Sequence, residues 1–511
     1  MGNLKKFIAN GFILTITSIF LRWVGVFYNT YISNKLGTEG MGVYTLVQSV
    51  FGFAITFACS GINLGATRLI SEALANNNYS ELKKSLKNCI CYSLLFSLTA
   101  LFVVYSGAVF IGEKVLGDVR TIKAIRLLAL ALPFISLSSV FNGYFSAVRR
   151  VYKSASVMIL EQFIQIGVTV NILSFYAIKS VEYACMAVAV GILIAEISSL
   201  LYNFILWYID SRKYKTSDYS INKNLSKKLL SISLPLALST YVRSGLITIE
   251  HLLIPYGLRK NGATYSQAMS TYGLIQGMVF PIIMFSSCII YSFAGLLVPE
   301  LAAYNEKKQY NLINKTVSKV ICFSLIFSVG VAGVLMCYAY ELSVVFYNSS
   351  EAYYYIRLFA PLVVIMYLDG AIDGVLKGLN EQLHSMKINI ADAFMSVLLV
   401  YFLVPHLGVN GYIIAVFVCE IFNCGMSLTR LVNICQPEIS IIKSMLIPIF
   451  YIIVSSICVT GVFHYMGITR LTSKSNLAIR VLFTVLLYTF LNFRKKKTRK
   501  KEYKTKTPSS I

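Results

Sequence analysis

The sequence has few charged residues for its length. Only 13% of the 511 residues are charged, whereas 57% are hydrophobic. Soluble domains carry roughly 25% charged residues, so this scarcity excludes a chain built only from ordinary soluble domains. Apolar runs of about 18 residues or more can cross a bilayer as helices, because each residue adds about 1.5 Å to a helix. The composition therefore predicts an all-α integral membrane protein.

Residue patterns that catalysis and metal binding require are also missing. The four histidines are far apart, and none has the spacing of zinc ligands. The eleven cysteines show no paired metal-ligand spacing, which favours a role as small core residues. No GxxxxGK[ST] phosphate loop is present, which argues against ATP hydrolysis. We expect no enzyme activity, no metal and no cofactor, and we expect transport driven by a cation gradient, the membrane potential or consumption of product.

Long apolar runs follow one another along the whole chain. Their number is about fourteen, and two of them come after the first twelve. The predicted spans are 7–33, 41–64, 88–111, 122–148, 155–178, 183–208, 229–254, 267–298, 317–338, 353–376, 388–404, 411–431, 441–465 and 477–493.

Acidic residues are scarce relative to basic ones, 22 against 46, so the net charge is +24. The tail RKKKTRKKEYKTK, which begins at Arg494, resembles a nucleic-acid patch when it is taken alone. If the N-terminus is cytoplasmic, however, most Lys and Arg fall on inner loops, which is the positive-inside bias. We therefore expect the cytoplasmic membrane, both termini in the cytoplasm, anionic membrane lipids beside the tail, and no nucleic-acid partner.

The two halves of the chain resemble each other. GVYTLVQS at 42–49 matches STYGLIQG at 270–277, with Tyr44 on Tyr272 and Gln48 on Gln276. NGYFSAVRRVYKSAS at 142–156 likewise matches DGVLKGLNEQLHSMK at 373–387. Because each repeat holds six spans, both enter the membrane from the same side. We predict two six-helix lobes in a parallel pseudo-two-fold repeat, with domains at 1–215 and 216–434, two added spans at 435–493 and a basic cytoplasmic tail at 494–511.

An arginine lies within the first span of each repeat, Arg22 in LRWVG and Arg243 in TYVRSG. A charge at mid-bilayer costs about 2.5 to 3.5 kcal/mol and usually faces a bundle interior or a wet cavity. The matching depth of the two arginines favours a cavity between the lobes. Seven residues further on, and on the same helix face, come Asn29 and Glu250. A structural role, in which both arginines bridge carbonyls or snorkel, remains an alternative.

Several acidic residues also fall within the predicted spans. Asp369, Asp373 and Lys377 are spaced by four, which places them on one helix face. This stripe is either a self-neutralising ladder or a gate or ion site. Glu161 and Glu196 have counterparts in the second repeat, which favours structural roles for them. Unrepeated acids such as Glu250 and Asp369 are better candidates for ion coupling, because an ion site is normally needed once.

Two glycine motifs, GINLG at 61–65 and GLIQG at 273–277, have a spacing that permits close helix approach. Chance matches are expected among so many apolar helices. We interpret both motifs as packing contacts.

Four stretches indicate a family. They are LRWVG, LGTEGMGVYTLVQS, GINLGATRLISE and FNGYFSAVRRVYKSAS, which resemble the polysaccharide-flippase branch of the multidrug/oligosaccharidyl-lipid/polysaccharide exporter superfamily. The resemblance extends over almost the whole chain. Within this branch the chain is similar to the stage V sporulation protein B subfamily and to the peptidoglycan-precursor (lipid II) flippases.

The resemblance implies roles for particular residues. Arg22 stands where the family has a cavity arginine that meets the lipid pyrophosphate. Tyr28 and Asn29 stand where the family has a second arginine and an acid. Arg243 is then expected to supply the missing charge, and Arg68 to help admit the headgroup. Gln48 and Gln276 are expected to be polar residues of the cavity.

The leading hypothesis is a flippase that moves an undecaprenyl-pyrophosphate-linked cell-wall precursor or oligosaccharide outward by alternating access, including for spore cortex peptidoglycan. Its expected partners are this polyprenyl-pyrophosphate-linked saccharide and cell-wall synthases. Two alternatives stay open. One is a cation-coupled multidrug exporter on the same scaffold, and the other is a non-transporting membrane scaffold for wall synthesis.

Overall fold

The computed structural model is helical, and no strand occurs in the part of the chain that it describes. That part comprises 2–76, 78–175, 180–212, 224–438, 440, 442–465 and 474–505, with only the backbone described at 2–12, 14, 474 and 493–505. Twelve of these helices are long and apolar enough to span a membrane, or thirteen if one bent pair counts as a span. The prediction of an all-α integral membrane protein is confirmed. The last six residues of the predicted basic tail, 506–511, lie outside the described residues.

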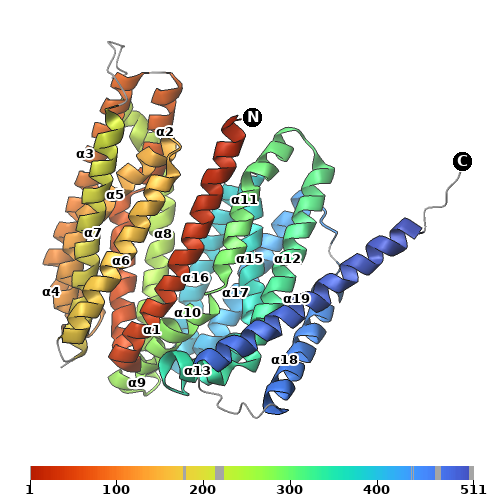
Figure 1. The fold of residues 1–511 in the computed structure, drawn as a ribbon. Coiled ribbons are helices and arrows are strands. Elements are labelled where there is room, and N and C mark those ends of the chain that lie inside the picture. Colours follow the sequence, from red (N-terminus) through yellow and green to blue (C-terminus); the bar gives the residue numbers. More distant parts are fainter. Residues whose placement is uncertain are drawn as a thin grey trace, which may run out of the picture. The chain divides into compact units, whose positions relative to one another are not determined.

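Two compact units contain the helices (Figure 1). Unit 1 consists of Met1–Gly277 and Asn389–Val416, and unit 2 of Met278–Ile388 and Phe417–Ile511. The predicted domain boundaries at 215 and 434 stay predictions. Unit 1 contains α1 (Gly2–Cys59), α2 (Ile62–Ala75), α3 (Tyr79–Ser106), α4 (Ala108–Phe110), η1 (Ile111–Val115), η2 (Val119–Thr121), α5 (Ile122–Ala147), α6 (Val151–Phe175), α7 (Val181–Ser211), α8 (Leu225–Lys260), α9 (Tyr265–Tyr272) and the larger part of η3 (Gly273–Val279).

Unit 2 contains most of the helices from α10 onward, including the two helices beyond the predicted repeats. Two helices, α16 (Gln382–Leu407) and α17 (Val409–Ile434), have residues in both units. The others are α10 (Phe280–Ile283), α11 (Ser287–Glu306), α12 (Tyr310–Cys337), α13 (Ala339–Tyr347), α14 (Ala352–Phe359), α15 (Leu362–Gly378), η4 (Ile442–Leu446), α18 (Ile447–Tyr465) and α19 (Lys474–Thr505).

The first two predicted spans are the two helical parts of α1, which meet at a turn at Gly37. Gly37 has φ 70° and ψ −177°, a conformation that glycine adopts without the steric cost of a side chain. The second span also ends before its predicted limit at Leu64. Ser60 and Gly61 both have positive φ, at 45° and 69°, so the α-helix stops there and α2 begins as a separate helix.

Two further predicted spans are broken helices. The span predicted at 267–298 divides into α9, the π-helix η3, α10 and α11. The span predicted at 353–376 is the bent pair α14 and α15, whose axes differ by 54° on either side of Ala360 and Pro361. Proline lacks a backbone N–H and its ring clashes with the preceding turn, which accounts for the bend.

Helix α5 is at the centre of unit 1, where it packs against α2, α3 and α7, while α6 lies along α7 (Figure 1). Tyr144 and Phe145 of α5 are fully buried among apolar side chains of α2 and α3. Aromatic side chains of this size contribute strongly to a core because each removes a large apolar area from water. This core gives α1 and α8 a fixed support.

The internal repeat has a counterpart in the backbone. Three pairs of left-handed residues occur in the same order in the two halves of the chain. Arg149 and Asn380 have φ 57° and 64°, and they are equivalent in the sequence match described above. Left-handed residues other than glycine are uncommon, so their recurrence supports the repeat. The other two pairs are Gly37 with Gly262 and Gly117 with Asn348.

The next position carries opposite charges in the two repeats. In unit 1, Arg150 forms an ion pair with Asp210 of α7, and Lys153 lies 3.3 Å from the same carboxylate. In unit 2, the equivalent Glu381 forms a bidentate pair with Arg430 of α17 at 2.8 to 2.9 Å. Each ion pair links the turn between two consecutive helices to a residue near the C-terminal end of a third helix. The contact is therefore repeated while its polarity is reversed.

We predict that Asp210→Ala lowers the free energy of unfolding by about 3 kcal/mol, because it leaves two cations around a site where Asp210 is 0% exposed. Glu381→Ala is the matched variant. Its ion pair is partly exposed, so we expect a loss of about 1 kcal/mol or less. Denaturant unfolding in detergent micelles measures both values, and equal losses would contradict the difference in burial.

Candidate functional site

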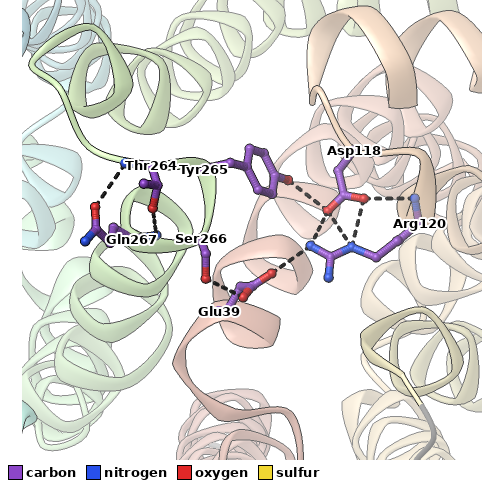
Figure 2. Close-up of polar contacts among 7 residues, drawn as sticks. All are labelled: Glu39, Asp118, Arg120, Thr264, Tyr265, Ser266 and Gln267. Carbon is purple, nitrogen blue, oxygen red and sulfur yellow. Dashed lines mark hydrogen bonds and ion pairs between the residues drawn. The ribbon is translucent and has the colours of Figure 1, made fainter.

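Five polar residues form one cluster at the end of unit 1 where α1 turns (Figure 2). Arg120 donates to both oxygens of Asp118 at 2.8 to 3.0 Å and to Glu39 at 2.9 Å. Helix α9 contributes the two remaining contacts: Tyr265 donates to Asp118 at 2.8 Å, and Ser266 to Glu39 at 2.6 Å. These residues, called the Arg120 cluster below, join α1, η2 and the start of α9.

Local capping fixes both sides of the Arg120 cluster. Asp118 is the N-cap of η2 and accepts from the backbone N–H of Arg120 at 2.9 Å. Helix α9 begins with a capping box, in which Thr264 and Gln267 each accept a hydrogen bond from the backbone of the other. Tyr265 and Ser266 follow that cap directly, so their hydroxyl groups are held in place.

The electrostatics of the Arg120 cluster favour its ionised form. Burial on its own raises the pKa of Asp118, but hydrogen bonds from Arg120 and Tyr265 outweigh burial and hold this pKa below the ordinary value for aspartate. The stability from this carboxylate is therefore present above the ordinary aspartate pKa and is lost only as the pH falls through the lowered one. Asp118 is 7% exposed. Such a cluster can lock one end of α9 in place.

Glycines allow close backbone contact beneath the Arg120 cluster. A Cβ atom on Gly42 of α1 would lie 2.1 Å from the carbonyl oxygen of Met269, and one on Gly273 would lie 2.2 Å from that of Thr38. Near the start of α8, a Cβ on Gly65 would lie 2.2 Å from the Ser233 hydroxyl. None of these three contacts leaves room for a side chain. Gly65 and Gly273 belong to the two glycine motifs, so the packing interpretation of both motifs is confirmed.

Side chains bond backbone carbonyl groups at the π-helix η3. Pro281 has no backbone N–H, so the carbonyl of Gly277, four residues earlier, lacks its usual α-helical donor. Asn29 of α1 donates to the carbonyl of Gly277 at 2.9 Å. In unit 2, Tyr347 donates to the carbonyl of Met278 at 2.6 Å. Next to these groups, Gln276 donates to the Tyr412 hydroxyl.

The three predicted phosphate-binding arginines are all exposed residues of unit 1. Arg22 precedes the Gly37 turn by 15 residues, or about 22 Å of helix, and Arg243 precedes the end of α8 by 17, or about 26 Å. The two distances along the helices are similar. Arg68 is in the middle of α2 and lies 3.5 Å from Glu72. Their role in binding a phosphate stays a prediction.

The other predicted cavity residues differ in their surroundings. Tyr28 is buried and donates to Thr169 at 3.0 Å, and Gln48 donates to Tyr44 at 3.1 Å. Asn29 and Gln276, by contrast, both form hydrogen bonds at η3. Whether these residues line a cavity stays a prediction.

The predicted coupling acids are divided between the two units, with Glu250 in unit 1 and Asp369 and Asp373 in unit 2. Glu250 of α8 hydrogen-bonds with Ser396 of α16. Asp373 forms an ion pair with Lys377 at 2.6 Å and also accepts from Ser385, whereas Asp369 meets Asn423 at 3.5 Å. The ladder interpretation therefore fits Asp373 with Lys377, and Asp369 turns to another helix.

With this geometry established, the chain can be compared with known proteins. The profile of the family described as polysaccharide biosynthesis protein matches residues 7–288. The chain belongs to this family. The matched residues include the Arg120 cluster, Arg22 and Arg243, and all of η3.

Relatives of this polysaccharide biosynthesis protein include two from Bacillus subtilis (strain 168). Stage V sporulation protein B is 26% identical over 421 residues, which are 81% of each chain. Lipid II flippase MurJ is 21% identical over 449 residues, which are 80% of each chain. Among solved structures, an inward-facing multidrug resistance MATE family transporter of the MOP superfamily has a TM-score of 0.66 at 15% identity, covering 82% of this chain and 98% of that one. The fold is that of MOP-superfamily transporters.

None of the five Arg120-cluster residues is among the site residues predicted from the sequence of this family member. Glu39 lies within the family stretch LGTEGMGVYTLVQS, and the Gly117-Asp118 pair after an apolar run is a turn and capping signal that could have identified Asp118. No local signal identifies its partner Tyr265, which is 147 residues away in the chain.

We predict that Arg120→Ala loosens this end of unit 1 and increases the labelling rate of Cys185 by about tenfold. Cys185 is 3% exposed and lies near the start of α7, which packs against η2. Labelling with a membrane-impermeant maleimide, in a chain whose other ten cysteines are replaced by serine or alanine, measures the effect.

Lys123→Ala is the control for that experiment, because it removes a neighbouring ion pair, to Glu182 at 3.0 Å, that is outside the Arg120 cluster. We expect Cys185 to react at the parent rate in this variant. Equal labelling in the Arg120→Ala and Lys123→Ala variants would show that the cluster does not control access.

Proposed function

We propose that this transporter is a flippase that moves a polyprenyl-diphosphate-linked saccharide outward across the cytoplasmic membrane by alternating access. Membership of the polysaccharide biosynthesis family and the MOP-transporter fold support a transport role. The similarity to a sporulation protein and to a lipid II flippase supports a cell-wall precursor as cargo, including one for the spore cortex.

The observation that carries the proposal is the exposure of Arg22 and Arg243. Both expose more than a third of their surface in the middle of long apolar helices. Hydrocarbon does not solvate a guanidinium, so one in a span is stable only beside water, a polar protein group or an anionic ligand. Two such groups at similar depth in one unit define a positively charged zone. That zone suits an anion and disfavours the cationic drugs expected of a multidrug exporter.

The chemistry of a lipid-linked saccharide fits this zone. Its diphosphate cannot cross hydrocarbon unaided, whereas its polyprenyl tail is stable in the lipid. Guanidinium groups bind phosphate oxygens through paired hydrogen bonds and are weakly hydrated, which lowers the cost of leaving water. In our proposal Arg22 and Arg243 hold the diphosphate while the tail remains in the bilayer, and Arg68 attracts the headgroup at the entrance.

The Arg120 cluster supplies a gate for this cycle. We place both chain termini in the cytoplasm, from the distribution of basic residues, which puts the Gly37 turn and the start of α9 at the outer surface. The cluster then closes the outer end while the inner end admits cargo. Release outward requires that Tyr265 and Ser266 leave Asp118 and Glu39.

We predict that Arg22→Ala and Arg243→Ala each reduce translocation of a lipid-linked disaccharide at least tenfold, because each removes a charge-assisted contact to phosphate. Rates in proteoliposomes and complementation of a strain lacking its precursor flippase measure this. Arg212→Ala is the control, since Arg212 is exposed at the end of α7 and stacks on Tyr208. Complementation by both variants without any translocation in proteoliposomes would favour the scaffold alternative, and new drug resistance without lipid transport would favour the exporter.

We further propose that Glu250 couples transport to a cation gradient. Glu250 is half-buried in a span, hydrogen-bonds with Ser396, and forms no ion pair with a Lys or Arg among the residues with described side chains. A carboxyl group in such a place is stable only with a proton or another bound cation. Asp373 does not need one, because Lys377 already neutralises it.

We predict that transport by the parent chain responds to an imposed proton or sodium gradient and that transport by Glu250→Gln does not. Glutamine keeps the shape and the hydrogen bond to Ser396 but cannot change its charge. Asp373→Asn is the comparison and should keep its gradient response. Gradient-dependent transport by Glu250→Gln would rule this residue out as the coupling group.

A further inference from the structure

The side-chain amides of Asn29 and Gln276 both form hydrogen bonds at the π-helix η3. Asn29 Nδ2 donates to the carbonyl oxygen of Gly277 at 2.9 Å, and Gln276 Nε2 donates to the Tyr412 hydroxyl. Gly277 directly follows Gln276, so the two amides are anchored at successive residues of η3. Both side chains are partly exposed. Two helices from distant parts of the sequence therefore present one pair of amides.

Each amide uses its NH₂ group as an anchor and keeps its carbonyl oxygen as an acceptor. Within the described part of the chain, neither oxygen takes part in a hydrogen bond. Neither oxygen is among the buried polar atoms that lack a partner. It follows that both oxygens are accessible to solvent. A pair of fixed, accessible acceptors suits a ligand that carries O–H or N–H donors.

The π-helix occurs in only one copy of the repeat. The equivalent of Gln276 in the first copy is Gln48, which lies in the regular α-helix of α1 and donates to Tyr44 four residues earlier. The second copy widens the helix at this position, and Gln276 reaches the distant Tyr412. Single π-turns inside α-helices are frequent at functional sites. A feature that one repeat lacks is expected for a ligand, because a transporter needs one binding site for its cargo.

The amide pair is close to the proposed diphosphate site. Asn29 follows Arg22 by seven residues, almost two helical turns, so both lie on the same face of α1 about 10 Å apart along the axis. That distance corresponds to the first one or two sugar rings beyond a diphosphate. A diphosphate at Arg22 would therefore place its nearest sugars beside the two amides.

We propose that Asn29 and Gln276 form a saccharide-recognition subsite, in which their carbonyl oxygens accept hydrogen bonds from hydroxyl or acetamido N–H groups of the sugars nearest the diphosphate. The proposal rests on the proposed flippase function and adds to it the part of the cargo that is recognised. Tyr412 and the carbonyl of Gly277 orient the amides, and Arg22 holds the charge common to all such lipids. Selectivity for the glycan thus arises at η3.

The test compares two fluorescent lipids in proteoliposomes that contain the full chain. One is undecaprenyl diphosphate that carries an N-acetylated disaccharide, and the other is the same lipid without sugar. The measured quantity is the ratio of their initial translocation rates. We expect Asn29→Ala and Gln276→Ala each to lower this ratio about fivefold and the double variant to lower it more than tenfold, as for the loss of one and two hydrogen bonds. Gln276→Glu retains an acceptor oxygen and should keep the parent ratio.

Asn171→Ala is the matched control. The Asn171 amide also donates to a glycine carbonyl, that of Gly167 at 2.7 Å, but it is exposed and lies in the regular helix α6. Its loss should leave the ratio unchanged. An unchanged ratio in the Asn29 and Gln276 variants would overturn the subsite, also where both rates fall. Equal losses for the two lipids would indicate a purely structural role. Failure of the parent chain to move either lipid overturns the flippase function itself, and the subsite with it.

Discussion

The structure depends on one constraint: hydrocarbon solvates neither charges nor free peptide groups, so each such group in a span must have a partner or reach water. Asp210 meets this constraint with two cations, and the Gly277 carbonyl meets it with Asn29. Arg22 and Arg243 are exposed. The contacts of Asp210 and Gly277 hold the fold together, whereas the exposed arginines are accessible to a ligand.

Comparison of the two repeats separates structure from function. The left-handed residues Arg149 and Asn380 recur, and so does the ion pair that follows each of them, although its charges are exchanged. Exchange of charge is possible because such a contact needs only opposite signs, not a given residue at a given place. A binding site has no such freedom, since its ligand has one charge and one shape. The π-helix at Gln276, which replaces a regular helix at Gln48, is therefore more informative about cargo than any repeated feature.

The sequence was sufficient for the features that local composition determines. The spans, the repeat and the glycine packing motifs follow from apolar runs and spacing, and all have counterparts in the helices. The Gly37 turn falls in the break predicted between the spans 7–33 and 41–64. The π-helix was missed because the apolar pattern continues through it, and nothing in that pattern records how the backbone hydrogen bonds are paired. The Arg120 cluster was missed for a different reason. Its residues come from three separate segments, and only the fold brings Asp118 to Tyr265.

The short helix α9 links the two functional features of unit 1. Its first two residues, Tyr265 and Ser266, belong to the Arg120 cluster, and η3 with Gln276 follows directly after its last residue. A ligand can shift a conformational equilibrium only through a difference in its affinity for the two states. Hydrogen bonds at η3 that form in only one state would therefore bias the position of α9 and, through this rigid helix, the contacts of Tyr265. In the proposed cycle, recognition of the saccharide is thus coupled to the outer gate through eight residues of helix.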